Sequence, residues 1–99
     1  MALDSTPTIS VLRFRRVEIR DSARKHGIAD DDIAHAVDHA LVVAEIDPDK
    51  TLYLGPDRAA NLLEVVVVTR VGSDPLAIHA MRMRKQYEPY LRGKEDEDG

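Results

Sequence analysis

The sequence feature that most restricts the fold is a nearly unbroken apolar run over residues 62–68, with Leu62, Leu63 and Val65 to Val68. β-Branched residues favour strands, and a strand that is apolar on both sides is typical of a central strand covered on both faces. Turn sequences bound the run, Gly55-Pro56-Asp57 before it and Gly72-Ser73-Asp74-Pro75 after it. The chain is therefore expected to build a sheet around residues 62–68.

Three further segments have strand character. Residues 41–46 are apolar and partly β-branched, Asp47-Pro48-Asp49-Lys50 is a turn sequence, and residues 51–54 resume with β-forming side chains. Residues 76–81 follow the turn sequence at 72–75 and are expected to form another hairpin with residues 62–68. The pattern predicts a four-stranded antiparallel sheet.

Helices are expected before and after these strands. Ile19, Ala23 and His26 lie on one face of a helix over about 16–26, and Gly27 supplies the left-handed position that commonly ends one. Residues 30–40 repeat apolar side chains at helical spacing, and Asp30 to Asp32 offer a cap and negative charge at its start. Residues 84–92 predict a last helix that Pro89 kinks or shortens.

The order of these elements predicts an α+β fold, in which two N-terminal helices pack on a four-stranded antiparallel sheet and a short C-terminal helix follows. A chain of 99 residues has room for one core, so residues 1–99 are interpreted as one domain. Within it, residues 1–12 are expected to be a poorly ordered lead-in or, at 9–12, a short edge strand, residues 13–92 are the folded domain, and residues 93–99 are a disordered acidic tail.

Composition restricts the class of protein. A hydrophobic fraction of 43% with 32% charged residues is typical of a folded globular domain and not of a disordered chain. The chain has no Cys, no apolar run near the roughly 18 residues that cross a bilayer, and no charged and apolar leader at its start. We therefore expect a protein of the reducing cytoplasm with no membrane partner.

Charge is unevenly distributed. The net charge of −4 comes largely from the tail, where Lys94 stands against four acids. Residues 13–25 hold six cations and two acids, and residues 82–92 hold four cations and one acid. Clustered arginines are typical of a surface that binds phosphates or an acidic partner, although a solvated helix face has the same composition.

Several kinds of chemistry lack a motif. His35 and His39 have the i, i+4 spacing of two zinc ligands, but Ala36 stands where the HExxH motif needs Glu and no third ligand is in register, so no metal site is predicted. None of the serines lies in a hydrolase signature, and no G-x-G-x-x-G or Walker loop is present. No cofactor is expected.

Residues 78–87 hold the strongest candidate site. This stretch delivers His79, Arg82, Arg84, Lys85 and Tyr87 close together from a strand. Attack of an RNA 2′-OH on its phosphate requires a base, an acid and cations, which His, Tyr and Arg can supply. A sheet-facing His and a solvated basic helix would explain the same residues without chemistry.

The sequence resembles the BrnT-like toxins of type II toxin–antitoxin systems over about residues 16–91. The resemblance rests on Lys25-His26-Gly27-Ile28 before a helix with an acidic start, and on residues 78–84, Ile-His-Ala-Met-Arg-Met-Arg, before Tyr87. It implies a RelE/ParE-like fold, a metal-independent ribonuclease that cleaves mRNA and inhibits translation, and a cognate antitoxin in a hetero-oligomer. The RNA substrate could be free or on the ribosome.

The resemblance also implies site residues. Lys25 and His26 match the signature at the end of the first helix, Arg82 or Arg84 matches the basic position after the last strand, and Tyr87 or Tyr90 matches the tyrosine of the final helix. The role of His79 in proton transfer is inferred from its chemistry. The candidate catalytic residues are thus Lys25, His26, His79, Arg82, Arg84 and Tyr87, and the candidate RNA-binding residues are Arg58, Arg70 and Lys85.

Two other functions fit the same residues. One is a non-enzymatic interaction module of the same fold, which binds a topoisomerase or survives as an inactive partner of an antitoxin. The other is a binder of single-stranded nucleic acid that stacks bases on Tyr53, Tyr87 or Tyr90, for which three Tyr and one Phe provide little aromatic surface.

Overall fold

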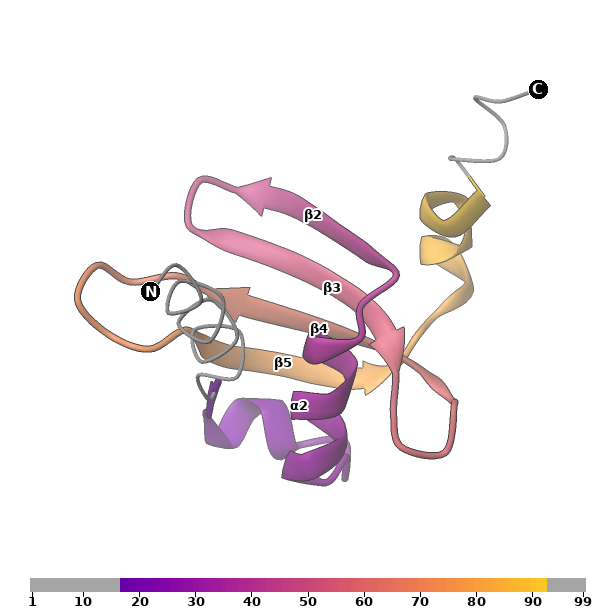
Figure 1. Cartoon of the computed structure of the whole chain (residues 1–99), viewed down its shortest axis with the longest axis horizontal. Coiled ribbons are helices and arrows are strands. Elements are labelled where there is room, and N and C mark those ends of the chain that lie inside the picture. The colour runs from indigo at the N-terminus through magenta and orange to yellow at the C-terminus, as the bar shows by residue number, and fades with distance from the viewer. Residues whose placement is uncertain (1–16, 93–99) are drawn as a thin grey trace, which may run out of the picture.

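The computed structural model describes residues 17–92, and the expectations for residues 1–12 and 93–99 lie outside that range. The described residues form one sheet of five strands, and Figure 1 shows how this sheet lies against the helices. In chain order the elements are strand β1 (Glu18–Ile19), the 3-10 helix η2 (Asp21–Arg24), the helix α2 (Asp30–Asp38), the strands β2 (Val42–Asp47), β3 (Lys50–Pro56), β4 (Leu62–Val68) and β5 (Leu76–Arg82), and the 3-10 helix η3 (Lys85–Tyr87).

The strand order across the sheet is β1-β5-β4-β3-β2. β2 to β5 form an antiparallel meander in which each strand pairs with the next, as the three turn sequences dictate. β1 joins the far edge and runs parallel to β5, with Glu18 opposite Leu76. The sheet is therefore mixed, and β2 forms its other edge.

The predicted fold class is wrong in two respects. The sheet has five strands in mixed orientation instead of four antiparallel ones, and the first predicted helix is replaced by β1 and the four-residue turn η2. Val17 and Ile19 are half-buried while Glu18 and Arg20 are exposed, which is the alternation of a strand. The backbone N–H groups of Glu18 and Arg20 donate to Pro75 and Ala77, so the edge of β5 offers hydrogen bonds that override the helical spacing.

Other predicted elements agree with the structure. The strands predicted at 41–46, 51–54, 62–68 and 76–81 correspond to β2 to β5, and the second helix corresponds to α2. The N-cap of α2 is Ala29, which has no side chain that could cap the helix, and Asp30 and Asp32 in the first turn bind arginines. The last helix begins with η3 and continues through Arg92, so Pro89 lies in the first turn of that continuation, where its missing N–H costs little.

The helical segments η2 and α2 cover one face of the sheet (Figure 1). Strand alternation points every second side chain of β4 toward them, and the core forms where these side chains meet the buried positions of the helical segments. None of the described helices is long and apolar enough to cross a membrane. The core cluster contains Ala23, Ile33, Ala36, Leu63, Val65, Val67, Ala77 and Ala80.

Gly55 lets α2 approach β3 closely. A Cβ atom added at this position would clash with the backbone oxygen of Ala36 and lie 2.9 Å from the Cα of Ala40. Both neighbours are main-chain atoms, one in α2 and one just after it, so the contact cannot be relieved by a change of side-chain rotamer. The separation of helix and sheet depends on this glycine.

We predict that Gly55→Ala lowers the free energy of unfolding by about 2 kcal/mol or more, because α2 must move away from the sheet. Urea denaturation measures the change. An unchanged midpoint would show that α2 does not lie this close to β3.

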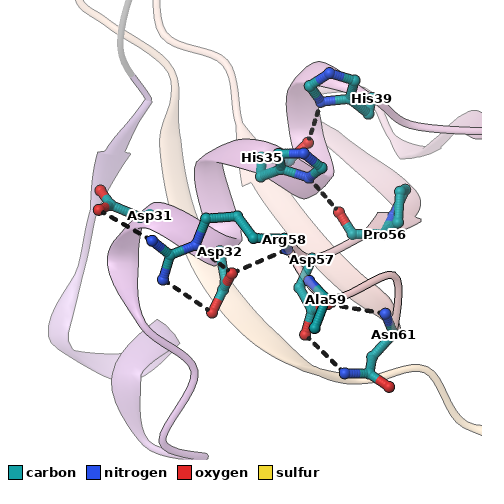
Figure 2. Close-up of polar contacts among 9 residues, drawn as sticks. All are labelled: Asp31, Asp32, His35, His39, Pro56, Asp57, Arg58, Ala59 and Asn61. Atoms are coloured by element: carbon teal, nitrogen blue, oxygen red, sulfur yellow. Dashed lines mark hydrogen bonds and ion pairs between the residues drawn. The ribbon is translucent and has the colours of Figure 1, made fainter.

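The loop between β3 and β4 holds the other unusual backbone position. Asp57 Oδ1 accepts hydrogen bonds from the backbone N–H groups of Ala59 and Asn61, and the loop folds around this carboxylate (Figure 2). Ala60 lies at the tip with a φ of 70°, in the left-handed region that L residues other than Gly rarely adopt. The loop therefore carries backbone strain at Ala60.

We predict that Ala60→Gly raises the free energy of unfolding by about 0.5 to 1 kcal/mol, since glycine removes this strain at some cost in chain entropy. The same urea titration serves as the test. Gly55→Ala serves as the comparison, because it exchanges the same two residue types and its expected change in the free energy of unfolding has the opposite sign. A loss of stability in Ala60→Gly would contradict the assignment of strain.

Candidate functional site

The candidate site is organised by Glu64, which stands in the middle strand of the sheet and has no exposed surface. Leu63 and Val65 point to the core beneath α2, so Glu64 points to the opposite face. β5 brings His79 to the same face, where its Nε2 lies 2.9 Å from Glu64 Oε2. Arg84, just beyond β5, donates to the same carboxylate from its Nη2 at 2.6 Å and its backbone N at 3.0 Å.

Two opposing effects set the pKa of Glu64, namely its burial and the hydrogen bonds from these donors. Burial by itself raises the pKa of the Glu64 carboxyl, but the hydrogen bonds from the Arg84 side chain, His79 and the Arg84 backbone outweigh it and hold the pKa below its ordinary value. The same hydrogen bond with Glu64 raises the pKa of Arg84. Glu64 is therefore an anion and Arg84 a cation at neutral pH.

His79 is oriented by this carboxylate. An ionised carboxylate only accepts hydrogen bonds, so Nε2 of His79 carries the proton and Nδ1 of the neutral ring is left with a lone pair. The ring of His26 approaches edge-on, with a distance of 5.9 Å between the ring centroids. His79 is part-buried and His26 is exposed, so two imidazoles meet where solvent and a ligand can reach them.

Arg84 connects the carboxylate to two tyrosines. Its guanidinium carbon lies 5.7 Å from the centroid of the Tyr87 ring, within the range of a cation–π contact. Tyr87 meets Tyr90 edge-on at 5.8 Å between centroids. The Arg84 side chain stays 45% exposed although its Nε and Nη2 atoms are held by Glu64, so the cation remains accessible from one side.

The structure thus brings together four of the six candidate catalytic residues. His26, His79, Arg84 and Tyr87 form a connected group around Glu64. Arg82 does not join them, because it pairs with Leu63 in the sheet register and so points to the other face from Glu64. Lys25 precedes His26 on the surface with its side chain exposed, and Lys85, at the start of η3, is exposed beside Arg84.

Arg58 and Arg70 lie apart from this group. Arg58, in the β3–β4 loop, donates from Nε to Asp32 Oδ1 at 2.7 Å and reaches Asp31 at 3.7 Å (Figure 2). This pairing lowers the pKa of Asp32, chiefly through the side-chain hydrogen bond of Arg58. Arg70 follows the other end of β4, roughly 20 Å along the strand from Glu64, and contacts Glu18 and the backbone of Asp74.

His35 and His39 stack with 4.1 Å between ring centroids and 20° between ring planes. The Nδ1 atoms face the carbonyl oxygens of Pro56 and His35 respectively, as Figure 2 shows. Lone pairs in nearly parallel planes do not converge on one ion, so the pair is not a preformed chelate. Within residues 17–92 there is no group of three or more His, Cys, Asp or Glu side chains that could hold a metal.

Glu64 is the residue that sequence reasoning missed. It is the one acid within the apolar run 62–68, and a carboxylate in a strand buried on both faces needs partners because an unpaired buried charge is costly. The interruption of the run was therefore the available signal. His79, placed in the next strand, was the partner to look for.

Comparison with family models, with curated proteins and with solved structures gave no match. The likeness to BrnT-like toxins therefore remains an interpretation of the sequence, and the function has to be argued from the site itself.

We predict that Glu64→Gln lowers the free energy of unfolding by about 2 kcal/mol at pH 7, since the amide cannot accept the charge-assisted bonds of Arg84 and His79. Folding lowers the pKa of Glu64, so its contribution is fully present above the ordinary value of 4.5 and is lost as pH falls through the lower folded value. Urea titrations of both proteins between pH 7 and pH 3 measure the difference.

The matched control is Glu45→Gln, because Glu45 is an exposed glutamate on β2 and its replacement should leave stability unchanged. A difference between wild type and Glu64→Gln that stayed constant down to pH 3 would mean that the carboxylate does not stabilise the fold as an anion.

Proposed function

We propose that this protein is a metal-independent endoribonuclease whose site is the group around Glu64, and that it acts as the toxin of a type II toxin–antitoxin pair on mRNA. The single observation that supports catalysis best is the meeting of two imidazoles, His26 and His79, beside a cation, Arg84, with one ring oriented by a buried carboxylate. General acid–base cleavage of RNA needs this set of groups.

The geometry suggests a division of roles. Nδ1 of His79, which holds the free lone pair when the ring is neutral and Nε2–H bonds Glu64, takes the proton of the 2′-OH, and the 2′-oxygen attacks phosphorus. The bond from phosphorus to the 5′-oxygen breaks, and a protonated His26 gives its proton to that oxygen. Arg84 stabilises the charge on the phosphate oxygens. The products are a 2′,3′-cyclic phosphate and a 5′-hydroxyl end, and no metal or cofactor takes part.

Glu64 acts as a positioning residue in this scheme. It holds His79 in one tautomer and Arg84 in one place, as the carboxylate does in other carboxylate–histidine pairs. Tyr87 lies against Arg84 and can supply a hydroxyl or a ring face to the nucleotide. Lys25 precedes His26 in the sequence and Lys85 follows Arg84. Both side chains are exposed and would add positive charge that attracts the RNA backbone.

The alternative is a protein-interaction module without catalysis. The observation in its favour is that the Nε and Nη2 atoms of Arg84 are committed to Glu64, which a purely structural ion pair would also require. The two functions differ in the fate of RNA, because only the first cleaves it.

We predict that the purified protein cleaves single-stranded RNA in EDTA, leaves 2′,3′-cyclic phosphate ends, and does not cleave the DNA of the same sequence. His79→Ala or His26→Ala should lower the rate by about 10²- to 10⁴-fold, the usual contribution of a general acid or base. His35→Ala is the matched control, since this histidine lies in α2 outside the group, and it should keep the activity.

Expression in a bacterial host separates the two functions. Growth arrest with mRNA cleavage that is lost in Arg84→Ala supports the ribonuclease toxin. Arrest with intact RNA, or a purified protein whose activity survives both histidine substitutions, would contradict it and direct attention to a protein target.

A further inference from the structure

The unpaired edge of the sheet at β2 is the second notable surface of the molecule. β2 has one neighbour, β3, so about half of its backbone N–H and C=O groups lack a partner strand among residues 17–92. Natural proteins usually protect such an edge with Lys, Pro or a covering segment. Residues 42–46, Val-Val-Ala-Glu-Ile, contain neither Lys nor Pro.

Exposed apolar side chains gather at the same edge. Leu41 is 57% exposed, Val43 60% and Ile46 44%. Within residues 17–92 the other exposed large hydrophobic side chains are Val71 and Tyr90, which lie elsewhere on the chain. An open strand edge combined with exposed β-branched side chains is typical of a site where a partner adds a strand.

The charge around the edge indicates what kind of strand it accepts. Glu45 and Asp47 lie on β2 and Asp49 lies in the turn that follows, while Lys50 is the first residue of β3, opposite Asp47. No ion pair joins any of these three carboxylates to another described residue. A second copy of this chain would bring the same carboxylates against them, whereas a basic strand would compensate them.

We propose that β2 is a docking edge for an extended segment of a partner protein in which Lys or Arg alternates with β-branched apolar residues. Val42 and Ala44 point to the face that holds Leu52 and Leu54, because they are opposite these residues in the register. The apolar side chains of the partner extend that row, and its basic side chains lie on the other face beside Glu45, where their methylene chains cover the exposed Val43. Asp47 and Asp49 add negative charge at the hairpin end.

This surface is separate from the proposed catalytic group. β5, which carries His79 and precedes Arg84, is three strands from β2, about 14 Å across the sheet. The acidic edge at β2 and the group around Glu64 therefore lie on different parts of the molecule. A partner on β2 does not need to compete with RNA, and the inference does not depend on ribonuclease activity.

The test is titration of the ¹⁵N-labelled full chain with a synthetic hexapeptide in which lysine and valine alternate, followed by NMR and by calorimetry. We expect the largest chemical-shift changes at residues 42–47. A peptide of the same sequence with every backbone amide N-methylated cannot pair as a strand and should bind at least about tenfold more weakly.

A charge-reversed variant gives the matched control. Both side chains changed in Glu45→Lys with Asp47→Lys are exposed, so the fold should be kept, and the spectrum outside β2 checks this. The variant should lose affinity for the lysine peptide and gain affinity for one in which glutamate and valine alternate. The His79→Ala variant should bind the lysine peptide as the wild type does.

Three results would overturn the proposal. One is equal binding of the N-methylated peptide, which would show attraction between charges without strand pairing. Another is shift changes located away from β2. The third is sedimentation of the free protein as a dimer that the Glu45→Lys, Asp47→Lys variant alters, because the occupant of the edge would then be a second copy.

Discussion

The buried carboxylate of Glu64 joins β4 to β5 and to the segment that follows β5. β4 alone carries it into the middle of the sheet, and the donors that make its charge tolerable come from β5 and from the segment just after β5. A buried anion without such donors would cost several kcal/mol. The direction in which the chain leaves the sheet after Arg82 is thereby coupled to the protonation state of one side chain.

Much of the sheet could be predicted because turn sequences and apolar runs are local signals. The hairpins on either side of β4 are marked by Pro, Gly and Asp, and α2 by its helical spacing. β1 could not be predicted, because a two-residue strand has no pattern of its own and forms only where the edge of β5 supplies hydrogen bonds. Ile19 and Ala23 fit a helix by spacing, yet the tertiary partner decided their conformation.

The site was partly predictable for a similar reason. His79, Arg84 and Tyr87 are close in the sequence, so their proximity in space followed from one strand end. The contact of His26 with His79 depends on how η2 lies against β5, which no local pattern encodes. Closeness in the sequence is not sufficient, because Arg82 lies only two residues before Arg84 and yet its side chain points to the face of the sheet opposite Glu64.

The parallel pairing of β1 with β5 has a consequence for the order of folding. The meander β2 to β5 closes through short turns, so its contacts are local and form without a large loss of chain entropy. β1 and η2 reach β5 across almost the whole domain, as in the bond from Ser22 to the carbonyl of Ile78, 56 positions away. Closing so long a loop costs more chain entropy than closing a hairpin turn, so we expect η2 to dock on β5, and His26 to reach His79, only after the meander has formed.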